Sequence, residues 1–372
     1  MRAIVMPDSF KGTMSSAQIC RIFEEKLTQR GHHALCLPVA DGGEGTVEAM
    51  LTAVGGQRVT LKVTGPRFEP VDSFYGILPD GTAVVEMAAA AGLPMMGDTP
   101  DATVTTTYGV GELLADAVRR GCRRIILGLG GSATNDGGCG AAAALGVRFF
   151  DGEGQTFIPV GGTLGRIARI ERDGDPLQGA ELIAMCDIDN PLTGERGAAA
   201  VFGPQKGASP AQVKLLDGGL THLAALIRRD LGVDVEHLAG AGAAGGLGGG
   251  AAAFLGARLQ SGIETVLDTV EFDHKLEQAD VVFTGEGRID AQSMAGKVVI
   301  GIARRAKVKG VPVIAVVGDA ADGVDAPAYE NGVTAVFTIN RLAIPFSQAK
   351  PRAAADMAAT VENLIRALEL KL

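Results

Sequence analysis

The fold class is decided by residues 2–39, RAIVMPDSFKGTMSSAQICRIFEEKLTQRGHHALCLPV. Apolar residues 3–6 predict a first strand, and the apolar run at 34–39 predicts a second. Between them, Ser15 followed three residues later by Gln18 forms a capping box, which marks the start of an amphipathic helix. A strand, a helix and a strand in so short a segment indicate a right-handed βαβ unit within a parallel sheet.

The C-terminal part of the chain repeats this alternation. Three apolar segments predict strands there, at 280–284, 312–317 and 334–338. Helical patterns separate and follow them, near 295–308 and 350–370. Both ends of the chain therefore predict the same doubly wound parallel sheet.

The middle of the chain has a different pattern. Residues 57–64 and 71–86 alternate between apolar and polar like antiparallel strands, with a turn at 79–81. We therefore expect an α/β protein with two domains. Both chain ends, 1–62 plus 275–372, form the doubly wound domain, and 63–274 form an inserted second α/β domain. Clefts between domains are common ligand sites, so we expect the active site between the two.

Composition excludes several classes of function. Of 372 residues, 47% are hydrophobic and 21% are charged, which is typical of a soluble globular protein. The net charge is −9 and there is no run of basic residues, which argues against a nucleic-acid partner. The five cysteines stand singly, which favours reduced thiols in a cytoplasmic protein. Residues 238–257 carry no charge, but they are mostly alanine and glycine, so we interpret them as a loop and packed helix, not a membrane span.

The sharpest candidate for a site is the loop 128–138, GLGGSATNDGG, which follows an apolar strand and precedes an alanine-rich helix. Its glycines allow a ligand to approach the backbone closely, and a helix N-terminus favours phosphate. Ser132 and Thr134 offer hydroxyl groups, and Asp136 offers a carboxylate for a metal ion or a proton. We therefore expect this loop to bind phosphate.

A second loop, 284–290 with the sequence TGEGRID, also follows an apolar strand directly. Open α/β sheets bind ligands at the carboxyl ends of their strands. Arg288 suits a phosphate or a substrate carboxylate, and Glu286 and Asp290 suit a magnesium ion.

Further polar residues follow other predicted strands. Near the N-terminus, Asp8, Ser9 and Lys11 end the first strand, and Asp41 follows the next. In the segment 186–192, CDIDNPL, Asp187 and Asn190 suit a magnesium ion or a substrate hydroxyl, and Asp189 is an equal candidate for the metal. Lys206 in FGPQKG suits an anionic substrate.

Residues 240–245 match the pattern G-x-G-x-x-G of dinucleotide-binding proteins. That pattern requires a preceding strand, and residues 233–239, VDVEHLA, do not predict one. The chain has neither a G-x-x-x-x-G-K-[ST] loop nor the H-R-D and D-F-G segments of protein kinases. The phosphate-binding loop of P-loop nucleotide hydrolases and the mechanism of protein kinases are therefore excluded.

Seven segments together resemble the type 1 glycerate kinase family: PDSFKG, VADGGEGT, GLGGSATNDGG, CDIDNPL, FGPQKGAS, GAGAAGGLG and FTGEGRID. They lie between about residues 7 and 300 and follow the family's order. The resemblance implies ATP- and Mg²⁺-dependent phosphorylation of D-glycerate to 2-phosphoglycerate. It also implies a flavodoxin-like domain that carries an inserted α/β domain.

Phosphoryl transfer requires in-line positioning and neutralisation of charge. The expected binding residues are Asp8, Ser9, Gly130, Gly131, Ser132, Thr134, Asn135, Lys206, Gly242, Gly245 and Arg288. The expected catalytic residues are Asp136 as first choice for the base, Asp41 as second choice, and Lys11. The expected magnesium ligands are Asp187, Glu286 and Asp290.

Alternative functions stay open at this point. The 3-hydroxyl of glycerate is an alternative acceptor. A nicotinamide-dependent dehydrogenase of a small hydroxy acid and a non-catalytic sugar-acid sensor belong to other classes. We expect a small-molecule substrate and neither a nucleic acid nor a membrane as partner. The sequence leaves the oligomeric state open, with a homo-oligomer among the options.

Overall fold

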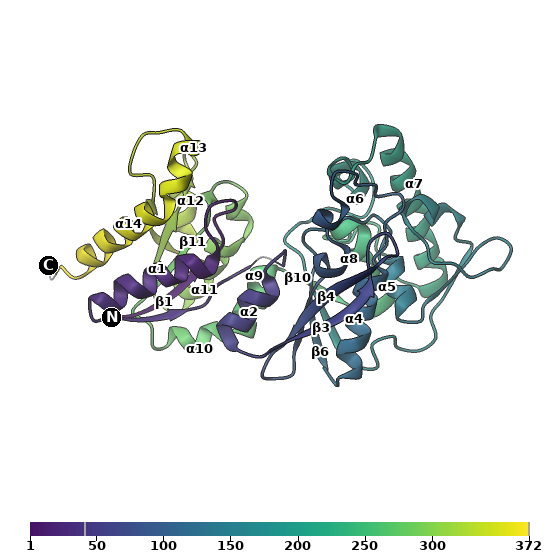
Figure 1. Ribbon diagram of the computed structural model, residues 1–372, viewed down its shortest axis with the longest axis horizontal. Helices are drawn as coiled ribbons and strands as arrows, with labels where there is room; N and C mark the ends of the chain where they lie inside the picture. Colours follow the sequence, from purple (N-terminus) through teal and green to yellow (C-terminus); the bar gives the residue numbers. More distant parts are fainter. Residues whose placement is uncertain (41, 371–372) are drawn as a thin grey trace. The chain divides into compact units, whose positions relative to one another are not determined.

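The computed structural model describes residues 1–40 and 42–370. The chain folds into two compact units (Figure 1). Unit 1 comprises Met1–Asp41, Glu48–Val54 and Gly262–Leu372, and unit 2 comprises Gly42–Val47 and Gly55–Ser261. Unit 2 thus resumes at residue 55 and ends at residue 261, whereas the sequence placed the inserted domain at 63–274. The strand that begins at residue 57 pairs within unit 2, which explains the earlier start.

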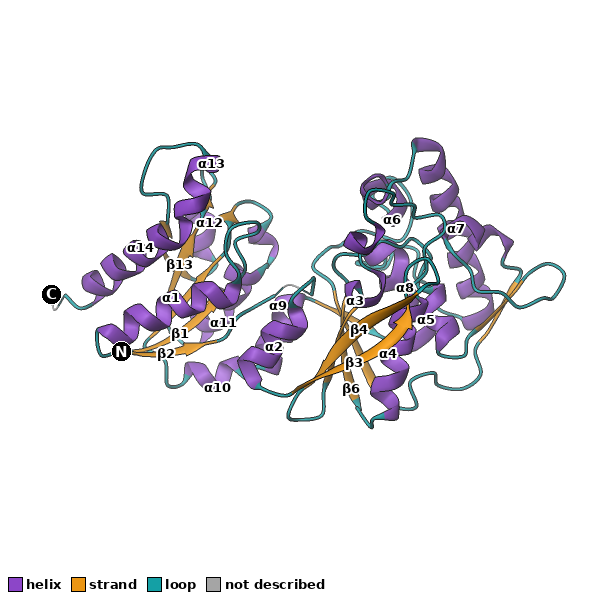
Figure 2. Ribbon diagram, viewed as in Figure 1, coloured by secondary structure: helices purple, strands orange, loops and turns teal. Residues whose placement is uncertain are grey.

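The sheet of unit 1 is entirely parallel (Figure 2). Its strands are β1 (Arg2–Pro7), β2 (His33–Cys36), β11 (Val281–Gly285), β13 (Val313–Val317) and β15 (Val333–Thr338). The order across the sheet is β15-β13-β11-β1-β2. Numbered along the unit, this order is 2-1-3-4-5, which is the flavodoxin-like arrangement. From β1 the chain adds β2 on one side, and it later adds β11 and the following strands on the other side. Ligands of such sheets bind at the carboxyl edge between β1 and β11, where the order changes sides.

The helices of unit 1 differ widely in length. They are α1 (Ser16–Gln29), α2 (Thr46–Val54, whose first two residues belong to unit 2), α9 (Gly262–Thr269), α10 (Phe272–Leu276), α11 (Val298–Val308), α12 (Asp325–Glu330), α13 (Phe346–Ala349) and α14 (Ala353–Leu368). The N- and C-terminal helices α1 and α14 pack side by side (Figure 1). Phe23 of α1 and Val361 of α14 share one core with Phe283 of β11. The predicted capping box of Ser15 and Gln18 is present at the start of α1.

The sheet of unit 2 is mixed, in the order β10-β9-β6-β5-β4-β3. Its strands are β3 (Gln57–Thr64), β4 (Pro70–Ile77), β5 (Ala83–Glu86), β6 (Arg124–Gly128), β9 (Glu181–Met185) and β10 (Arg258–Gln260). Strands β3, β4 and β5 pair antiparallel, as the sequence predicted, and residues 78–82 form the turn between β4 and β5. Strands β5, β6, β9 and β10 are parallel, so four strand ends meet at one carboxyl edge.

The helices of unit 2 are α3 (Ala88–Ala91), α4 (Tyr108–Arg119), α5 (Cys139–Ala144), α6 (Ala198–Phe202), α7 (Pro210–Leu231) and α8 (Ala243–Leu255). The short strands β7 (Arg148–Phe150) and β8 (Arg169–Glu171) form a separate ribbon. A capping box of Ser209 and Gln212 opens α7, and Gly232 closes it in the left-handed conformation. Over residues 1–40 and 42–370, no helix has both the length and the apolar character needed to cross a bilayer.

The smaller elements occur mostly in the loops that follow strands. They are the two-residue strands β12 (Arg288–Ile289) and β14 (Asp319–Ala320), and the 3₁₀ helices η1 (Leu93–Met96), η2 (Gly161–Arg166), η3 (Pro204–Lys206), η4 (Ser293–Ala295) and η5 (Lys350–Arg352). β12 and β14 pair with each other in parallel and extend the loops that follow β11 and β13. These loops carry several of the residues that the sequence singled out.

Candidate active site

The loop between β6 and α5 has an exposed beginning and a buried end. Gly131 is exposed and Gly130 is half-buried, whereas residues 132–138 are all buried. Gly131 adopts a φ of +78°, a left-handed conformation that favours glycine. A ligand that meets this loop from solvent therefore meets Gly130 and Gly131 first.

Lys206 lies in η3 and holds the buried end of this loop. Its side chain is 2% exposed, and its Nζ atom donates to the carbonyl oxygen of Thr134 at 2.6 Å and to Ser132 Oγ at 3.3 Å. The Ser132 hydroxyl in turn accepts from the Thr134 backbone N–H at 3.0 Å. Burial lowers the pKa of Lys206 to about 7, and the charge of Asp136 opposes that shift.

Asp136 is fully buried and its carboxylate accepts four hydrogen bonds. Oδ2 accepts from the Thr107 N–H and hydroxyl, both at 2.8 Å, and from the Gly140 N–H at 3.2 Å. Oδ1 accepts from the Gly138 N–H at 3.1 Å. Burial raises the pKa of Asp136, and these hydrogen bonds oppose the rise. This geometry joins the starts of α4 and α5, and favours a positioning role over that of a base.

Asn135 is also fully buried. Within the described part of the chain, neither its amide nitrogen nor its amide oxygen has a hydrogen-bond partner. Buried polar groups are almost always hydrogen-bonded, so an orphaned amide indicates a water molecule or a ligand group beside it. Asn135 therefore stays a prediction as a binding residue.

The glycines of 240–250 serve close packing against this same loop. A Cβ atom at Gly245 would lie 1.9 Å from the Thr134 carbonyl oxygen, and one at Gly242 would lie 2.4 Å from the Pro191 carbonyl oxygen. Gly245 also accepts a hydrogen bond from the Gly137 N–H at 3.1 Å. Both predicted phosphate-binding glycines are buried. In this structure they meet other backbone, not solvent, so their sequence pattern is explained by packing.

The residues that precede Gly240 form no strand. The helix α8 begins only at Ala243, and its backbone is left-handed at Ala244, Gly245 and Gly246. The G-x-G-x-x-G pattern thus lacks the strand–turn–helix context that dinucleotide binding requires. The structure thus confirms the expectation that no strand precedes this segment.

The glycines of 42–47 pass over the carboxyl ends of β6 and β9. The Gly130 N–H donates to the Gly42 carbonyl oxygen at 3.0 Å. A Cβ atom at Gly128 would lie 2.4 Å from that same oxygen, and one at Gly130 would lie 2.6 Å from the Gly43 Cα. This close approach explains why the segment belongs to unit 2. Asp41, the preceding residue and a predicted catalytic group, lies outside the described residues.

The structure distinguishes the two aspartates that follow β9. Asp187 is half-buried, and its Oδ1 atom accepts from the Ser261 hydroxyl at 3.1 Å. The Asp189 side chain is 74% exposed and lies 2.8 Å from Arg196 in a surface ion pair. Asn190 donates to the Arg196 carbonyl oxygen at 2.7 Å. Asp187 is therefore the aspartate at the carboxyl edge, where β9 and β10 end.

Glu86 is a polar residue at this edge that sequence reasoning missed. It ends β5, is 2% exposed, and its Oε1 atom accepts from the Val47 N–H at 2.7 Å. A carboxylate at the start of helix α2 complements the helix dipole. Its position at the end of an apolar strand, beside β6 in the sheet, is the signal that would have found it.

In unit 1, Glu286 directly follows β11, at the carboxyl edge beside β1, where the order of the strands changes sides. It is 9% exposed, and its Oε1 atom has no partner among the described residues. Burial raises the pKa of Glu286 to about 7. A hydrogen bond from Ser293 and the charge of Lys297 oppose the rise, while Asp8 and Asp290 add to it. The two electrostatic neighbours Asp8 and Asp290 were predicted, whereas Ser293 and Lys297 were not.

The loops that carry Asp8 and Asp290 are internally braced. Asp8 Oδ1 accepts from the Ser9 N–H at 2.6 Å, and the Asp8 N–H donates to the Gly285 carbonyl oxygen at 2.8 Å. Asp290 Oδ1 accepts from the Gln292 N–H at 2.8 Å. These contacts place Asp8, Ser9 and Glu286 at the carboxyl ends of the adjacent strands β1 and β11.

The two predicted cations of unit 1 lie at the surface. The Arg288 side chain is 61% exposed and its Nε atom lies 3.7 Å from Asp319 Oδ2. Lys11 is exposed in the loop after β1. At such exposure the ion pair contributes little to stability, which leaves the guanidinium able to reach an anionic ligand.

The acidic side chains of the candidate site are spaced apart. Among residues 1–40 and 42–370, no three His, Cys, Asp or Glu side chains cluster closely enough to hold a metal by themselves. Mg²⁺ usually binds one or two carboxylates together with water and substrate phosphates. The orphaned Glu286 Oε1 atom fits a site of that kind.

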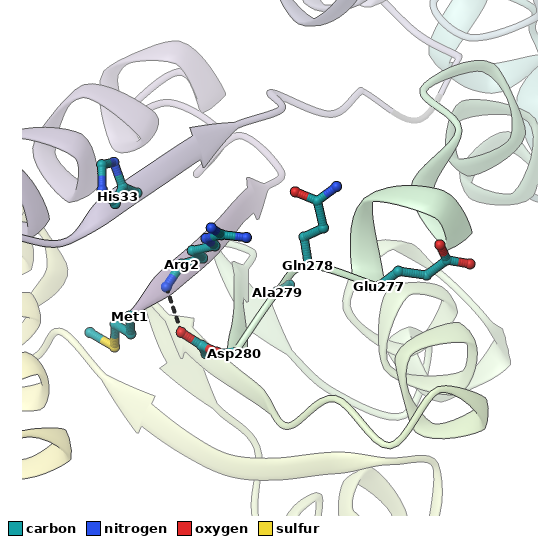
Figure 3. A pocket seen from close by; sticks show the side chains of 7 residues that line it. All are labelled: Met1, Arg2, His33, Glu277, Gln278, Ala279 and Asp280. Carbon is teal, nitrogen blue, oxygen red and sulfur yellow. Dashed lines mark hydrogen bonds between the residues drawn. The ribbon is translucent and has the colours of Figure 1, made fainter.

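A pocket of about 490 Å³ lies at the opposite, amino edge of the unit 1 sheet (Figure 3). Arg2, His33 and Asp280 line it, and the Arg2 N–H donates to Asp280 Oδ2 at 2.7 Å. None of the predicted site residues lines this pocket. Parallel sheets bind ligands at the carboxyl edge, so this pocket is separate from the candidate site.

The fold and these loops define an α/β protein with acidic and glycine-rich loops at the carboxyl edges of two sheets. Residues 3–369 match the model of the glycerate kinase family. The chain is 43% identical to a glycerate kinase of Bacillus subtilis, over all of this chain and 98% of that protein. It is 44% identical to a glycerate 2-kinase of Escherichia coli, over 91% of this chain and 90% of that protein.

A solved structure gives the same result. The crystal structure of a putative glycerate kinase 2 from Salmonella typhimurium matches with a TM-score of 0.88 at 42% identity. The match covers 99% of this chain and 98% of that one. The chain therefore belongs to the glycerate kinase family, and it is a kinase. The resemblance, the α/β fold and the enzyme class that the sequence predicted are confirmed.

Proposed function

We propose that this kinase transfers the γ-phosphoryl group of ATP to the 2-hydroxyl of D-glycerate, giving ADP and 2-phosphoglycerate. The observation that carries the proposal is the buried Glu286 carboxylate. One of its oxygens has no hydrogen-bond partner among the described residues, and the residue directly follows β11, beside β1, where the strand order changes sides. Family membership supports glycerate as substrate. The E. coli relative named glycerate 2-kinase supports the 2-hydroxyl over the 3-hydroxyl.

Within this proposal, the candidate magnesium ligands are Glu286 and Asp290, which follow β11, and Asp187, which follows β9. When bound, Mg²⁺ neutralises charge on the nucleotide phosphates. Glu286 suits this role because it is buried with an oxygen to spare. Asp187 suits it better than Asp189, whose exposed carboxylate is paired with Arg196.

Phosphate and substrate binding draw on the exposed parts of the loops. Gly131 offers its backbone N–H group at the accessible end of the loop, next to Gly130, whose own N–H is bonded to the Gly42 carbonyl oxygen. The buried Asn135 offers its amide. Arg288 and Lys11 supply positive charge for the glycerate carboxylate, and Asp8 and Ser9 lie close to Lys11 in the chain. Lys206 acts from behind the loop by fixing Ser132 and Thr134 in place.

A carboxylate accepts the proton of the substrate hydroxyl. Asp136 was the first candidate, but its four hydrogen bonds and full burial favour a positioning role. Asp41, the second candidate, then becomes the first. We propose Asp41 as the general base and Asp136 as the residue that holds the loop.

A coupled assay of ADP release tests the proposed reaction. We expect ADP release that requires both D-glycerate and Mg²⁺, and that EDTA abolishes. Nicotinamide turnover without magnesium dependence would point to the dehydrogenase alternative. Glycerate binding by calorimetry without any ADP release would point to the sensor. Either result would reject the proposal.

A further inference from the structure

Two cysteines of unit 1 lie in contact. Cys20 belongs to helix α1, and Cys36 is the last residue of strand β2. The Cys36 thiol donates to the Cys20 carbonyl oxygen at 3.4 Å. The Cys20 thiol reaches the Val5 carbonyl oxygen at 3.8 Å. No local pattern predicts this pair, because 15 residues separate the two positions.

The two thiols differ in their access to solvent. Cys20 is 4% exposed, whereas Cys36 is half-buried. The neighbouring Cys36 thiol and burial both raise the pKa of Cys20 well above its usual range. Because Cys36 is the more exposed of the two, an oxidant in solution reaches its thiol first. Cys20 then provides the second thiol.

We propose that Cys20 and Cys36 form a reversible redox site, which a small-molecule disulfide converts into an intramolecular disulfide. The Cys36 thiolate attacks one sulfur of the small disulfide, which forms a mixed disulfide and releases one thiol. Cys20 gives up its proton and attacks the Cys36 sulfur, which releases the second thiol. Two protein thiols are thereby oxidised, and one small disulfide is reduced to two thiols.

This redox site is linked to the candidate active site through one turn of helix α1. Ser16 lies one turn before Cys20, on the same buried face. Its hydroxyl donates to the Pro7 carbonyl oxygen at 2.7 Å and accepts from the Val39 N–H at 3.0 Å. Pro7 directly precedes Asp8, and Val39 lies two residues before Asp41. A covalent bond between α1 and β2 therefore acts on the two chain segments that lead into Asp8 and Asp41.

Cys186 provides a matched control. It is half-buried like Cys36, but it lies in unit 2, where its thiol donates to the Ile188 carbonyl oxygen at 3.2 Å. Burial raises the pKa of Cys186. It therefore tests whether partial exposure alone accounts for a reaction with the oxidant.

The experiment treats the full-length protein with glutathione disulfide and then traps free thiols with an alkylating agent. We expect two of the five thiols to be lost, with a Cys20–Cys36 linked peptide in the mass spectrum and no glutathione retained. We expect kinase activity to change by about fivefold or more and to return with dithiothreitol. Cys36→Ser should abolish the link and the change in activity, and Cys186→Ser should preserve both. Cys20→Ala should leave glutathione bound to Cys36.

Three outcomes would overturn the proposal. They are glutathione that stays on Cys36 of the wild type, a link that joins other cysteines, and an oxidised enzyme with unchanged activity. Thiol counts and mass spectra do not depend on catalysis. A failure of the proposed kinase reaction would therefore be seen in the reduced enzyme, separately from a failure of the redox site.

Discussion

The Nζ atom of Lys206 lies 2.6 Å from the carbonyl oxygen of Thr134, in a position that is 2% exposed. A charged ammonium group is costly to bury, and the two hydrogen bonds to the loop offset part of that cost. The loop it fixes contains Ser132, Asn135 and Asp136, which the sequence singled out. Lys206 is thus a positioning residue for the candidate active site.

The first prediction concerns Lys206→Met. Methionine fills a similar volume without a charge, so we expect the unfolding free energy at pH 7 to change by no more than about 2 kcal/mol. The loop loses its anchor, and we expect kcat/KM to fall by as much as about 100-fold. Lys214→Met replaces an exposed lysine of α7 and is the matched control. It should leave both quantities near wild type. Wild-type kinetics in Lys206→Met would show that the anchor is dispensable.

The second prediction concerns pH. The pKa of Lys206 is about 7 in the folded state, below the ordinary value of about 10.4 in the unfolded chain. Between these values the unfolded state binds more protons, so the contribution of Lys206 to stability rises with pH above 7. The difference in unfolding free energy between wild type and Lys206→Met should therefore grow in favour of wild type, by at most about 1.4 kcal/mol per pH unit. Urea unfolding at pH 6.5, 7.5 and 8.5 measures it, and a flat difference would contradict it.

The third prediction separates two costs of replacing glycine. Gly245 and Gly256 both have a left-handed backbone, with φ of +66° and +67°. A Cβ atom at Gly245 would lie 1.9 Å from the Thr134 carbonyl oxygen, whereas one at Gly256 has nothing within 4 Å. We expect Gly256→Ala to cost about 1–2 kcal/mol and Gly245→Ala to cost distinctly more. Chemical denaturation measures both, and equal costs would refute the packing role of Gly245.

The sequence predicted the features that depend on local chemistry. The capping boxes at Ser15 and Ser209 form as expected, because each needs residues only three positions apart. The parallel and antiparallel pairings also follow from the predicted strands and their order. Long-range packing set the rest. The burial of Asp136, the anchor at Lys206 and the contact between Gly245 and Thr134 join segments far apart in the chain, and no local pattern reports such contacts.

The fourth prediction separates the two candidate bases. Asp41→Asn should lower kcat by about 100-fold or more with little change in stability, as expected for loss of a general base. Asp136→Asn should lower the melting temperature, because the amide nitrogen that replaces one carboxylate oxygen cannot accept a hydrogen bond from the donors that face it. Steady-state kinetics and thermal unfolding measure both variants. An Asp41→Asn enzyme with wild-type kcat would return the role of base to another carboxylate.

The fifth prediction tests the two aspartates after β9. If Asp187 holds magnesium, Asp187→Asn should raise the Mg²⁺ concentration for half-maximal activity by about tenfold or more. Asp189→Asn removes an exposed ion pair with Arg196 and should leave that concentration unchanged. Magnesium titrations of the two variants give the answer directly. A larger effect from Asp189→Asn would reverse the assignment.

The central claim is that the chain phosphorylates the 2-hydroxyl of D-glycerate with ATP. Phosphorus NMR of the product, recorded with coupling to protons, tests it most directly, because the phosphate of 2-phosphoglycerate has one proton on its neighbouring carbon. We predict a doublet that appears only when ATP, Mg²⁺ and D-glycerate are all present. A triplet, which indicates the 3-phosphate with its two neighbouring protons, or the absence of any phosphate ester would contradict the claim.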